Sequence, residues 1–155
     1  MLYHTTTGTR DNPPLLLLHG FLGSHADFLG LLPTLSKHFY CIAADLPGHG
    51  KTETKLGDYT FAHTARAIAD LLDYLNVRKT HVLGYSMGGR VALYLACEFG
   101  DRIANLMVES ASPGLKAAFD RKQRQQQDDL TALSLLKMPL PDFLDQWYKN
   151  PLFAD

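Results

Sequence analysis

Four short apolar runs limit the folds that this chain can adopt. They are PLLLLHG (14–20), HFYCIAAD (38–45), THVLG (80–84) and ANLMVES (104–110). Continuous apolar runs of this length are typical of strands that are buried on both faces of a sheet. Three segments with helical spacing lie between them, at 25–37, 61–75 and 88–99. This alternation predicts an α/β fold, a mainly parallel sheet with helices on both faces.

The chain changes in composition after Ser110. From Pro113 onward it is polar and helix-forming, it is interrupted at Pro139 and Pro141, and it has no strand pattern. We therefore expect two parts: residues 1–112 supply the sheet, and residues 113–155 form part of a helical cap. In a parallel sheet, active sites lie at the carboxyl ends of the strands, so the chemistry is expected in the first part.

Charge and composition exclude several kinds of partner. Fifteen Lys and Arg residues balance sixteen Asp and Glu residues, without a basic block, so neither nucleic acid nor a membrane surface is an expected partner. The N-terminus lacks the pattern of a secretory signal, and the longest aliphatic run, Leu15–Leu18, is too short to span a bilayer. We expect a cytoplasmic protein, in which Cys41 and Cys97 are buried free thiols.

The segment GYSMGGR, Gly84–Arg90, has the pattern G-x-S-x-G between an expected strand and an expected helix. Such a turn needs glycines because the serine has a strained backbone and side chains beside it would collide with neighbouring elements. The turn exposes the Ser86 hydroxyl and places the Met87 N–H at the start of a helix, where negative charge is favoured. It predicts a catalytic serine, and the strand before it and the apolar helix after it argue against a chance turn serine.

Two further loops follow expected strands. LLLLHGFLGS (15–24) resembles the loop that supplies a second oxyanion-hole N–H in the α/β-hydrolase fold, here that of Phe21. We interpret His19 in this loop as a structural histidine that hydrogen-bonds the loop. In DLPGHG (45–50), Asp45 and His49 look like a catalytic pair, but they resemble loop-shaping residues of the fold.

The motifs together resemble one enzyme family. HGFLGS, DLPGHG, GYSMGGRVALYLA, VESASPGL, arginines in the cap segment and QWYKNPLF are similar to the 2-succinyl-6-hydroxy-2,4-cyclohexadiene-1-carboxylate synthases of menaquinone biosynthesis. The first two motifs are common among α/β-hydrolases, whereas S-P-G-L followed by W-Y-x-x-P-L-F is narrow to this family. The resemblance covers nearly the whole chain. It implies a lyase that removes a proton from its substrate and expels pyruvate.

The resemblance also implies how the reaction proceeds. Ser86, activated through a histidine, starts the proton abstraction, and the N–H groups of Phe21 and Met87 hold the charge that develops on a carbonyl oxygen. Neither a metal nor an organic cofactor is implied. The implied substrate is a small molecule with several carboxylates, which guanidinium groups bind well.

Four residues match the family's substrate-binding positions: Tyr85, Arg90, Arg124 and Trp147. Taken from sequence alone, three of them have another interpretation. Arg90 is also compatible with a solvent-facing charge, Arg124 with an i,i+4 pair to Asp128 on a polar helix, and Trp147 with core packing. The residues nearby are expected to be structural: Arg121 on the surface, Tyr148 and Phe153 in the core.

The chain departs from the family in one respect. Members continue through two further strands, which carry a catalytic aspartate and then a histidine, whereas none of the seven histidines here follows Ser86. The resemblance therefore implies a chain truncated after the start of the cap, nearly inactive by itself, with an exposed sheet edge after residues 104–110 that pairs with a second chain or another copy.

Three explanations stay open: a fragment or broken reading frame of a synthase, which we favour, one piece of a two-chain protein, or a non-catalytic interaction module. A general esterase on the same fold is a further alternative. It would use Ser86 covalently and would release no pyruvate.

Overall fold

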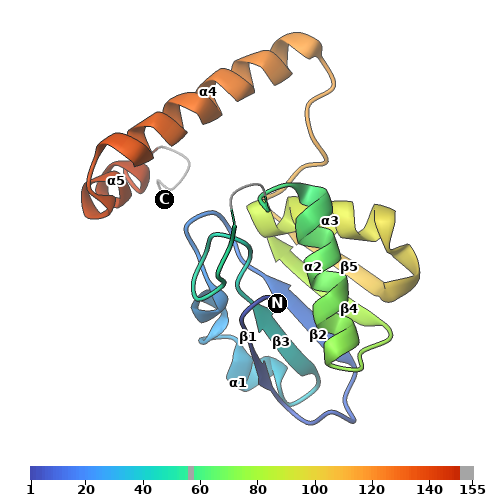
Figure 1. The fold of residues 1–155 in the computed structure, drawn as a ribbon. Helices are drawn as coiled ribbons and strands as arrows, with labels where there is room; N and C mark the ends of the chain where they lie inside the picture. The colour runs from blue at the N-terminus through green and yellow to red at the C-terminus, as the bar shows by residue number, and fades with distance from the viewer. Residues whose placement is uncertain (56–57, 151–155) are drawn as a thin grey trace. The chain divides into compact units, whose positions relative to one another are not determined.

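The structure, a computed structural model, describes residues 1–55 and 58–150. The chain divides into two compact units, Met1–Pro113 and Gly114–Asp155. Five strands form one sheet in the first unit, in the spatial order β1-β3-β2-β4-β5. Their bounds are His4–Thr7 (β1), Pro14–Leu18 (β2), Tyr40–Ala44 (β3), Thr80–Tyr85 (β4) and Ile103–Glu109 (β5). Figure 1 shows how the strands are arranged.

The sheet is mainly parallel, which confirms the predicted α/β architecture. β2 pairs in parallel with β3 and β4, and β4 pairs in parallel with β5. β1 pairs antiparallel with β3, and the sequence analysis missed it. Its residues, HTTT, include no aliphatic side chain, so the strand is formed through its ladder to β3 and gives no apolar signal.

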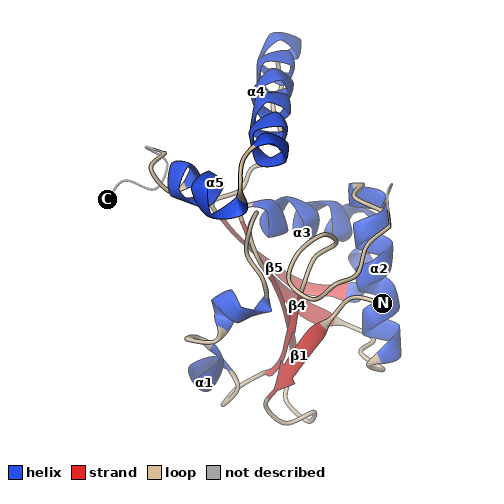
Figure 2. Ribbon diagram, turned by 60° about the vertical axis from the view of Figure 1, so that its left-hand side comes forward, coloured by secondary structure: helices blue, strands red, loops and turns tan. Residues whose placement is uncertain are grey.

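Helices cover both faces of the sheet, as Figure 2 shows for α1 on one side and α2 and α3 on the other. Successive leucines of β2 point to opposite faces. Leu16 and Leu18 pack in the cluster that contains α2 (Phe61–Tyr74) and α3 (Met87–Glu98). Leu15 and Leu17 pack in the cluster that contains residues of η1 (His25–Phe28) and α1 (Leu32–Leu35). The continuous apolar run of β2 is thus explained by burial on two sides.

One predicted helix is wrong. The segment 25–37 was expected to form a single helix, but it forms the 3₁₀ helix η1 and the separate one-turn helix α1. Gly30 lies between the two, and Pro33, in the first turn of α1, has no N–H to continue a helix from η1. The other two predicted helices, α2 and α3, agree with the expected segments to within one residue at each end.

Two expectations about burial are also wrong. β5 is not buried on both faces: it lies at the end of the strand order, and Ala104, Asn105, Met107 and Glu109 are exposed. Cys97 is exposed, whereas Cys41 is buried and both thiols are free. The reason is helical phase, because α3 turns Gly88, Val91, Ala92 and Leu95 toward the core and Cys97 falls on the opposite side.

The second unit contains two helices, α4 (Ala118–Lys137) and α5 (Leu140–Trp147). No residue of α4 is buried, and α5 buries Phe143, whose ring stacks on Trp147 with 6.1 Å between centroids. Tyr148 was expected in the core but is 57% exposed, because it lies just past the last turn of α5. Phe153 lies outside the described residues. Within the described part of the chain, no helix is both long and apolar enough to cross a membrane.

Replacement of Ile68 by alanine is expected to destabilise the fold. The Ile68 side chain is fully buried between α2 and the sheet, and removing it leaves a cavity that costs about 2–5 kcal/mol. Chemical denaturation measures this loss. Leu29→Ala serves as the control because Leu29 is exposed, and it should cost less than about 0.5 kcal/mol. Equal losses in the two variants would contradict the described core.

Candidate active site

The carboxyl ends of three neighbouring strands lie at one level. Leu18, the last residue of β2, pairs with Ala44 at the end of β3 and with Gly84 near the end of β4. The loops that follow these strands therefore leave the sheet at the same edge. They contain the predicted oxyanion loop, the DLPGHG loop and Ser86, so the structure brings these three segments together.

Ser86 lies between β4 and α3 with φ 51° and ψ −113°. A serine rarely adopts this left-handed conformation, which costs free energy and persists only where the surroundings enforce it. Its backbone N–H donates to the Glu109 carbonyl on β5, at 2.9 Å. Ser86 is partly buried, and among the described residues no side chain hydrogen-bonds its hydroxyl. The strained backbone predicted from G-x-S-x-G is confirmed.

Two glycines allow α3 to approach the sheet. A Cβ on Gly84 would lie 2.5 Å from the Gly88 carbonyl oxygen, and a Cβ on Gly88 would collide with the carbonyl oxygens of Leu18 and His19. The first turn of α3 thus rests directly on the ends of β4 and β2. This contact fixes where Ser86 lies and where the N–H of Met87 begins the helix.

The loop after β2 passes beside Ser86. A Cβ on Gly20 would lie 3.0 Å from the Tyr85 ring and 3.4 Å from the Ser86 Cβ. Phe21 follows directly, and its ring meets the His49 ring edge-on with 6.0 Å between centroids. Phe21 and Met87 therefore belong to the two backbone segments that lie beside Ser86.

His19 joins two of the loops. It is buried, its Nδ1–H donates to the Gly20 carbonyl at 2.7 Å, and its Nε2 accepts the Leu46 N–H at 3.0 Å. These two bonds require the neutral imidazole, because Nε2 acts as an acceptor. Burial lowers the pKa of His19, which favours the same neutral form. The interpretation of His19 as a structural histidine is confirmed.

Asp45 pairs with a histidine that the sequence analysis did not consider. Its buried carboxylate accepts the backbone N–H and the ring Nδ1–H of His25, at 2.6 and 2.8 Å, and the Lys51 N–H at 2.8 Å. His49 instead bonds the Pro47 carbonyl at 3.0 Å. Asp45 therefore shapes the loop, as expected. The one nearby sequence feature that could have pointed to His25 is the capping box of Ser24, which starts η1.

Arg90 and Tyr85 flank Ser86 along the chain. The Arg90 N–H donates to the Ser86 carbonyl at 3.1 Å, so Arg90 lies one helical turn beyond the serine. Its guanidinium lies 5.7 Å from the centre of the Phe61 ring. Tyr85 is 42% exposed, and its ring lies against Gly20. The structure thus brings Tyr85 and Arg90 together with Ser86, Phe21 and Met87.

The remaining two predicted residues, Arg124 and Trp147, belong to the second unit. Arg124 forms the i,i+4 ion pair with Asp128 that the alternative interpretation named, at 2.8 Å on an exposed face of α4. Trp147 is half-buried at the end of α5 and stacks on Phe143. Arg121 is exposed, as expected, and its guanidinium bonds the carbonyls of Leu115 and Lys116.

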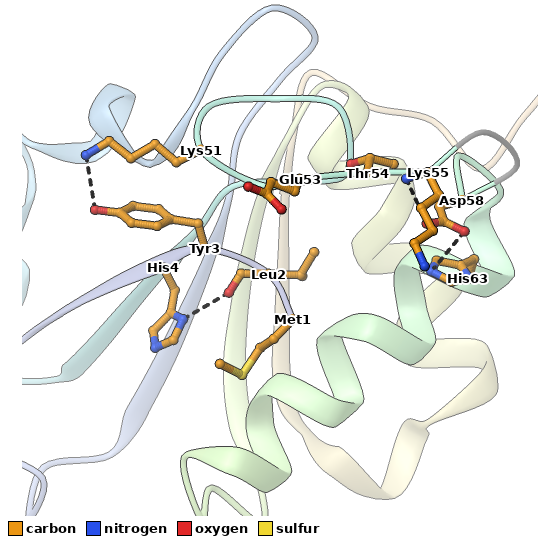
Figure 3. Close-up of a pocket in the computed structure, with 10 residues that line it drawn as sticks. All are labelled: Met1, Leu2, Tyr3, His4, Lys51, Glu53, Thr54, Lys55, Asp58 and His63. Atoms are coloured by element: carbon orange, nitrogen blue, oxygen red, sulfur yellow. Dashed lines mark hydrogen bonds and ion pairs between the residues drawn. The ribbon is translucent and has the colours of Figure 1, made fainter.

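A cavity of about 950 Å³ is lined by none of the predicted site residues. Figure 3 shows its ten lining residues, which come from the N-terminal segment, the loop after β3 and the start of α2. Within this lining, Asp58 lies 3.7 Å from the His63 ring, and Lys51 donates to the Tyr3 hydroxyl. No three His, Cys, Asp or Glu side chains in the described part of the chain are placed to hold a metal ion.

This geometry is that of a serine nucleophile turn on a mainly parallel sheet, and the comparison with protein families agrees. Residues 13–145 match the alpha/beta hydrolase fold family. The chain belongs to this family.

Two curated proteins and one solved structure are similar to this chain. The chain is 39% identical over 145 residues to the 2-succinyl-6-hydroxy-2,4-cyclohexadiene-1-carboxylate synthase of Yersinia pseudotuberculosis, which covers 92% of this chain and 52% of that protein. It is 35% identical over 158 residues to the chloroplastic protein PHYLLO of Arabidopsis thaliana, covering 97% of this chain and 9% of that protein. The solved structure of MenH from S. aureus superposes with a TM-score of 0.90 at 32% identity, covering 99% of this chain and 58% of that one. The chain thus spans about half the length of the synthase.

Replacement of Gly88 by alanine is expected to disturb the serine turn. The new Cβ has no space against the Leu18 and His19 carbonyls, so α3 must shift, at a cost of about 1–3 kcal/mol. Thermal and chemical denaturation measure the loss. Gly100→Ala is the matched control because a Cβ there meets nothing within 4 Å. A Gly88 variant as stable as the control would contradict the close contact between α3 and β2.

Replacement of Asp45 by asparagine is expected to lower stability in a pH-dependent way. Burial acts to raise the pKa of Asp45, but the hydrogen bonds from His25 and Lys51 outweigh it and hold the pKa below its ordinary value. A depressed folded-state pKa gives stability that is present above the unfolded value, about 3.9, and is lost as pH falls through the folded value. The variant should lose about 1.5–3 kcal/mol at pH 7, and the difference should shrink below about pH 4.

Chemical denaturation of the wild-type chain and of Asp45→Asn, from pH 7 down to about pH 2, measures this difference. Asp70→Asn provides the control, since Asp70 is exposed and forms only a surface i,i+4 pair with Arg66. A difference for Asp45→Asn that stays constant down to pH 2 would show that the carboxylate's charge contributes nothing.

Proposed function

We propose that this chain contributes the serine and the first part of the substrate site to a 2-succinyl-6-hydroxy-2,4-cyclohexadiene-1-carboxylate synthase of menaquinone biosynthesis. The observation on which this chiefly depends is Arg90, which lies one helical turn after Ser86. A fixed cation beside the nucleophile suits a substrate with carboxylates, whereas hydrolysis of a neutral ester does not require one. The 39% identity to the Yersinia synthase supports the same assignment.

The proposed reaction is an elimination. Ser86 takes a proton from a carbon of the substrate, and the electron pair left behind is delocalised onto a neighbouring carbonyl oxygen. The N–H groups of Phe21 and Met87 stabilise that oxyanion. The electrons then return to form the conjugated cyclohexadiene as the C–O bond to the leaving group breaks. The leaving group departs as the enolate of pyruvate, which takes up the proton that the base had received from Ser86 and becomes pyruvate. Every step is a proton transfer or a bond shift, so no redox partner is consumed.

The surroundings of Ser86 fit this chemistry. Its hydroxyl must pass a proton to a base before it can act, and a histidine has this role in the implied mechanism. His19 does not fit the role, because both of its ring nitrogens are engaged in loop bonds. His25 is held by the buried Asp45. We therefore propose that the base is a histidine other than these two.

Partners and location follow from the same assignment. We propose a small polycarboxylate substrate, which Arg90 binds with Tyr85 beside it, and to which Arg124 and Trp147 of the second unit contribute. We also propose that the free edge of β5 pairs with another strand, because β5 is the last strand in the sheet order and an edge strand leaves backbone groups unpaired. A reducing compartment such as the cytoplasm suits the two free thiols.

A chimera tests the proposal most directly. In it, this chain replaces the matching part of the Yersinia synthase, and pyruvate release from the synthase substrate is followed. The chimera should release pyruvate, and Ser86→Ala should lower kcat by on the order of a thousandfold, because the oxyanion hole and binding alone leave only a small residual rate. Ser36→Ala, at the end of α1, is the serine control and should leave the rate unchanged.

Assays of the 155-residue chain alone accompany the chimera, with circular dichroism as the folding control. A folded chimera that releases no pyruvate, or one that hydrolyses simple esters through Ser86 instead, would contradict the synthase assignment. Ester hydrolysis would favour an esterase on the same fold.

A further inference from the structure

We propose that Phe61 is a positioning residue for Arg90: its ring holds the guanidinium in the place where a substrate carboxylate is bound. This inference rests on the proposed function, because it specifies how the Arg90 guanidinium is held in position to bind the substrate. It concerns a residue that belongs to a different helix from the serine turn.

Phe61 departs from the packing of its own helix. α2 turns Ala65, Ile68 and Leu72 into the core, and Phe61 has the spacing of the same apolar stripe. Yet Phe61 is 39% exposed. It is the first residue of α2, directly after Thr60, whose hydroxyl accepts the His63 N–H at 3.1 Å and fixes where the helix begins. The ring is thus placed by a defined helix start and is only partly used for core packing.

The Phe61 ring contacts two residues of α3 that lie one turn apart. Tyr94 stacks on it, with 6.0 Å between centroids and 20° between planes, and the Arg90 guanidinium carbon lies 5.7 Å from its centre. The second distance is within the range in which a cation is attracted to the face of an aromatic ring. Tyr94 orients the ring of Phe61, and that ring then orients the cation.

The aromatic partner suits a binding arginine better than an acidic one. Arg66, Arg102 and Arg124 each pair with an aspartate, and Arg124 would have to leave Asp128 before it could bind a carboxylate. Arg90 lies over a ring instead, as Arg10 does over Tyr40, and no described acidic side chain pairs with it. A ring attracts the positive charge but accepts no in-plane hydrogen bond from the guanidinium, so its N–H groups can engage a carboxylate in two parallel bonds.

The position of Arg90 along α3 makes this orientation relevant to Ser86. The Arg90 N–H bonds the Ser86 carbonyl, and residues four apart lie on the same side of a helix. An arginine has a long side chain with several rotatable bonds, which would otherwise sample many positions. Holding it by Phe61 before the ligand arrives reduces the entropy lost on binding.

The position of the guanidinium can be tested without any ligand. The NMR signal of the Arg90 Nε–H reports the ring current of Phe61, and Arg90→Lys assigns the signal by its disappearance. Phe61→Leu should move this signal to the position of a solvent-exposed arginine, while Phe61→Tyr should preserve it. Tyr74→Leu is the matched control, since Tyr74 is an exposed aromatic on the same helix that contacts His4 instead.

Binding is measured with phthalate, a ring carboxylate that has a second carboxylate beside it, by titration calorimetry on the 155-residue chain. Arg90→Ala should abolish most of the affinity. Phe61→Leu should weaken binding about two- to fivefold, the change that loss of an exposed cation–π contact produces, and Phe61→Tyr should restore it. In the Arg90→Ala background, Phe61→Leu should cause no further loss, because Phe61 acts through Arg90.

The outcomes separate the inference from the proposed function. If Arg90→Ala weakens binding but Phe61→Leu does not, or if Phe61→Leu weakens it equally in both backgrounds, the inference is wrong and the proposed function stands. An Arg90 signal that Phe61→Leu leaves in place also overturns the inference. If the wild-type chain does not bind phthalate, or Arg90→Ala binds it normally, the proposed role of Arg90 in the function fails and the inference fails with it.

Discussion

The close contact between the first turn of α3 and the ends of β2 and β4 is the constraint on which the site depends. It exists because Gly84 and Gly88 have no side chains where backbone atoms meet. The same contact forces Ser86, between them, into a left-handed conformation. The free energy of that strain must be offset by packing elsewhere, and the buried strands β2 and β3 beneath the turn are where this chain concentrates its fully buried residues. The strained backbone of Ser86 therefore depends on the burial of the strands in the sheet.

Two buried polar side chains extend this arrangement to the surrounding loops. His19 binds the loop after β2 to the loop after β3, and Asp45 binds that second loop to the start of η1. The two side chains differ in charge. His19 is neutral because one ring nitrogen must accept a hydrogen bond, and Asp45 is ionised because all its partners donate hydrogen bonds to it. A buried polar group without partners would be costly, so each residue favours the single loop conformation that satisfies it. The loops are thereby held without help from regular secondary structure.

The sequence was sufficient for features whose cause is local. Apolar runs predicted β2, β3 and β4, and the spacing of glycines around Ser86 predicted the serine turn with its strained backbone. Features that depend on tertiary contacts were missed. β1 is polar and exists through its pairing with β3; the pairing of His25 with Asp45 joins residues twenty positions apart; and Cys97 is exposed because of the phase of α3. Phe61 shows the limit most clearly, since its spacing is that of a core residue while its contacts include the charge on Arg90.

The fold itself does not decide between hydrolysis and elimination, because a serine turn with an oxyanion hole stabilises negative charge on a carbonyl oxygen in either reaction. What separates them is whether the site also recognises the rest of the substrate. A neutral ester needs an apolar pocket, whereas a polycarboxylate needs cations whose hydrogen-bonding groups are available. An arginine paired with aspartate would satisfy its own charge before the substrate arrived, and an unrestrained arginine would lose entropy on binding. The Phe61 ring avoids both costs, so a change in the residue at this position would alter substrate preference while leaving the serine turn intact.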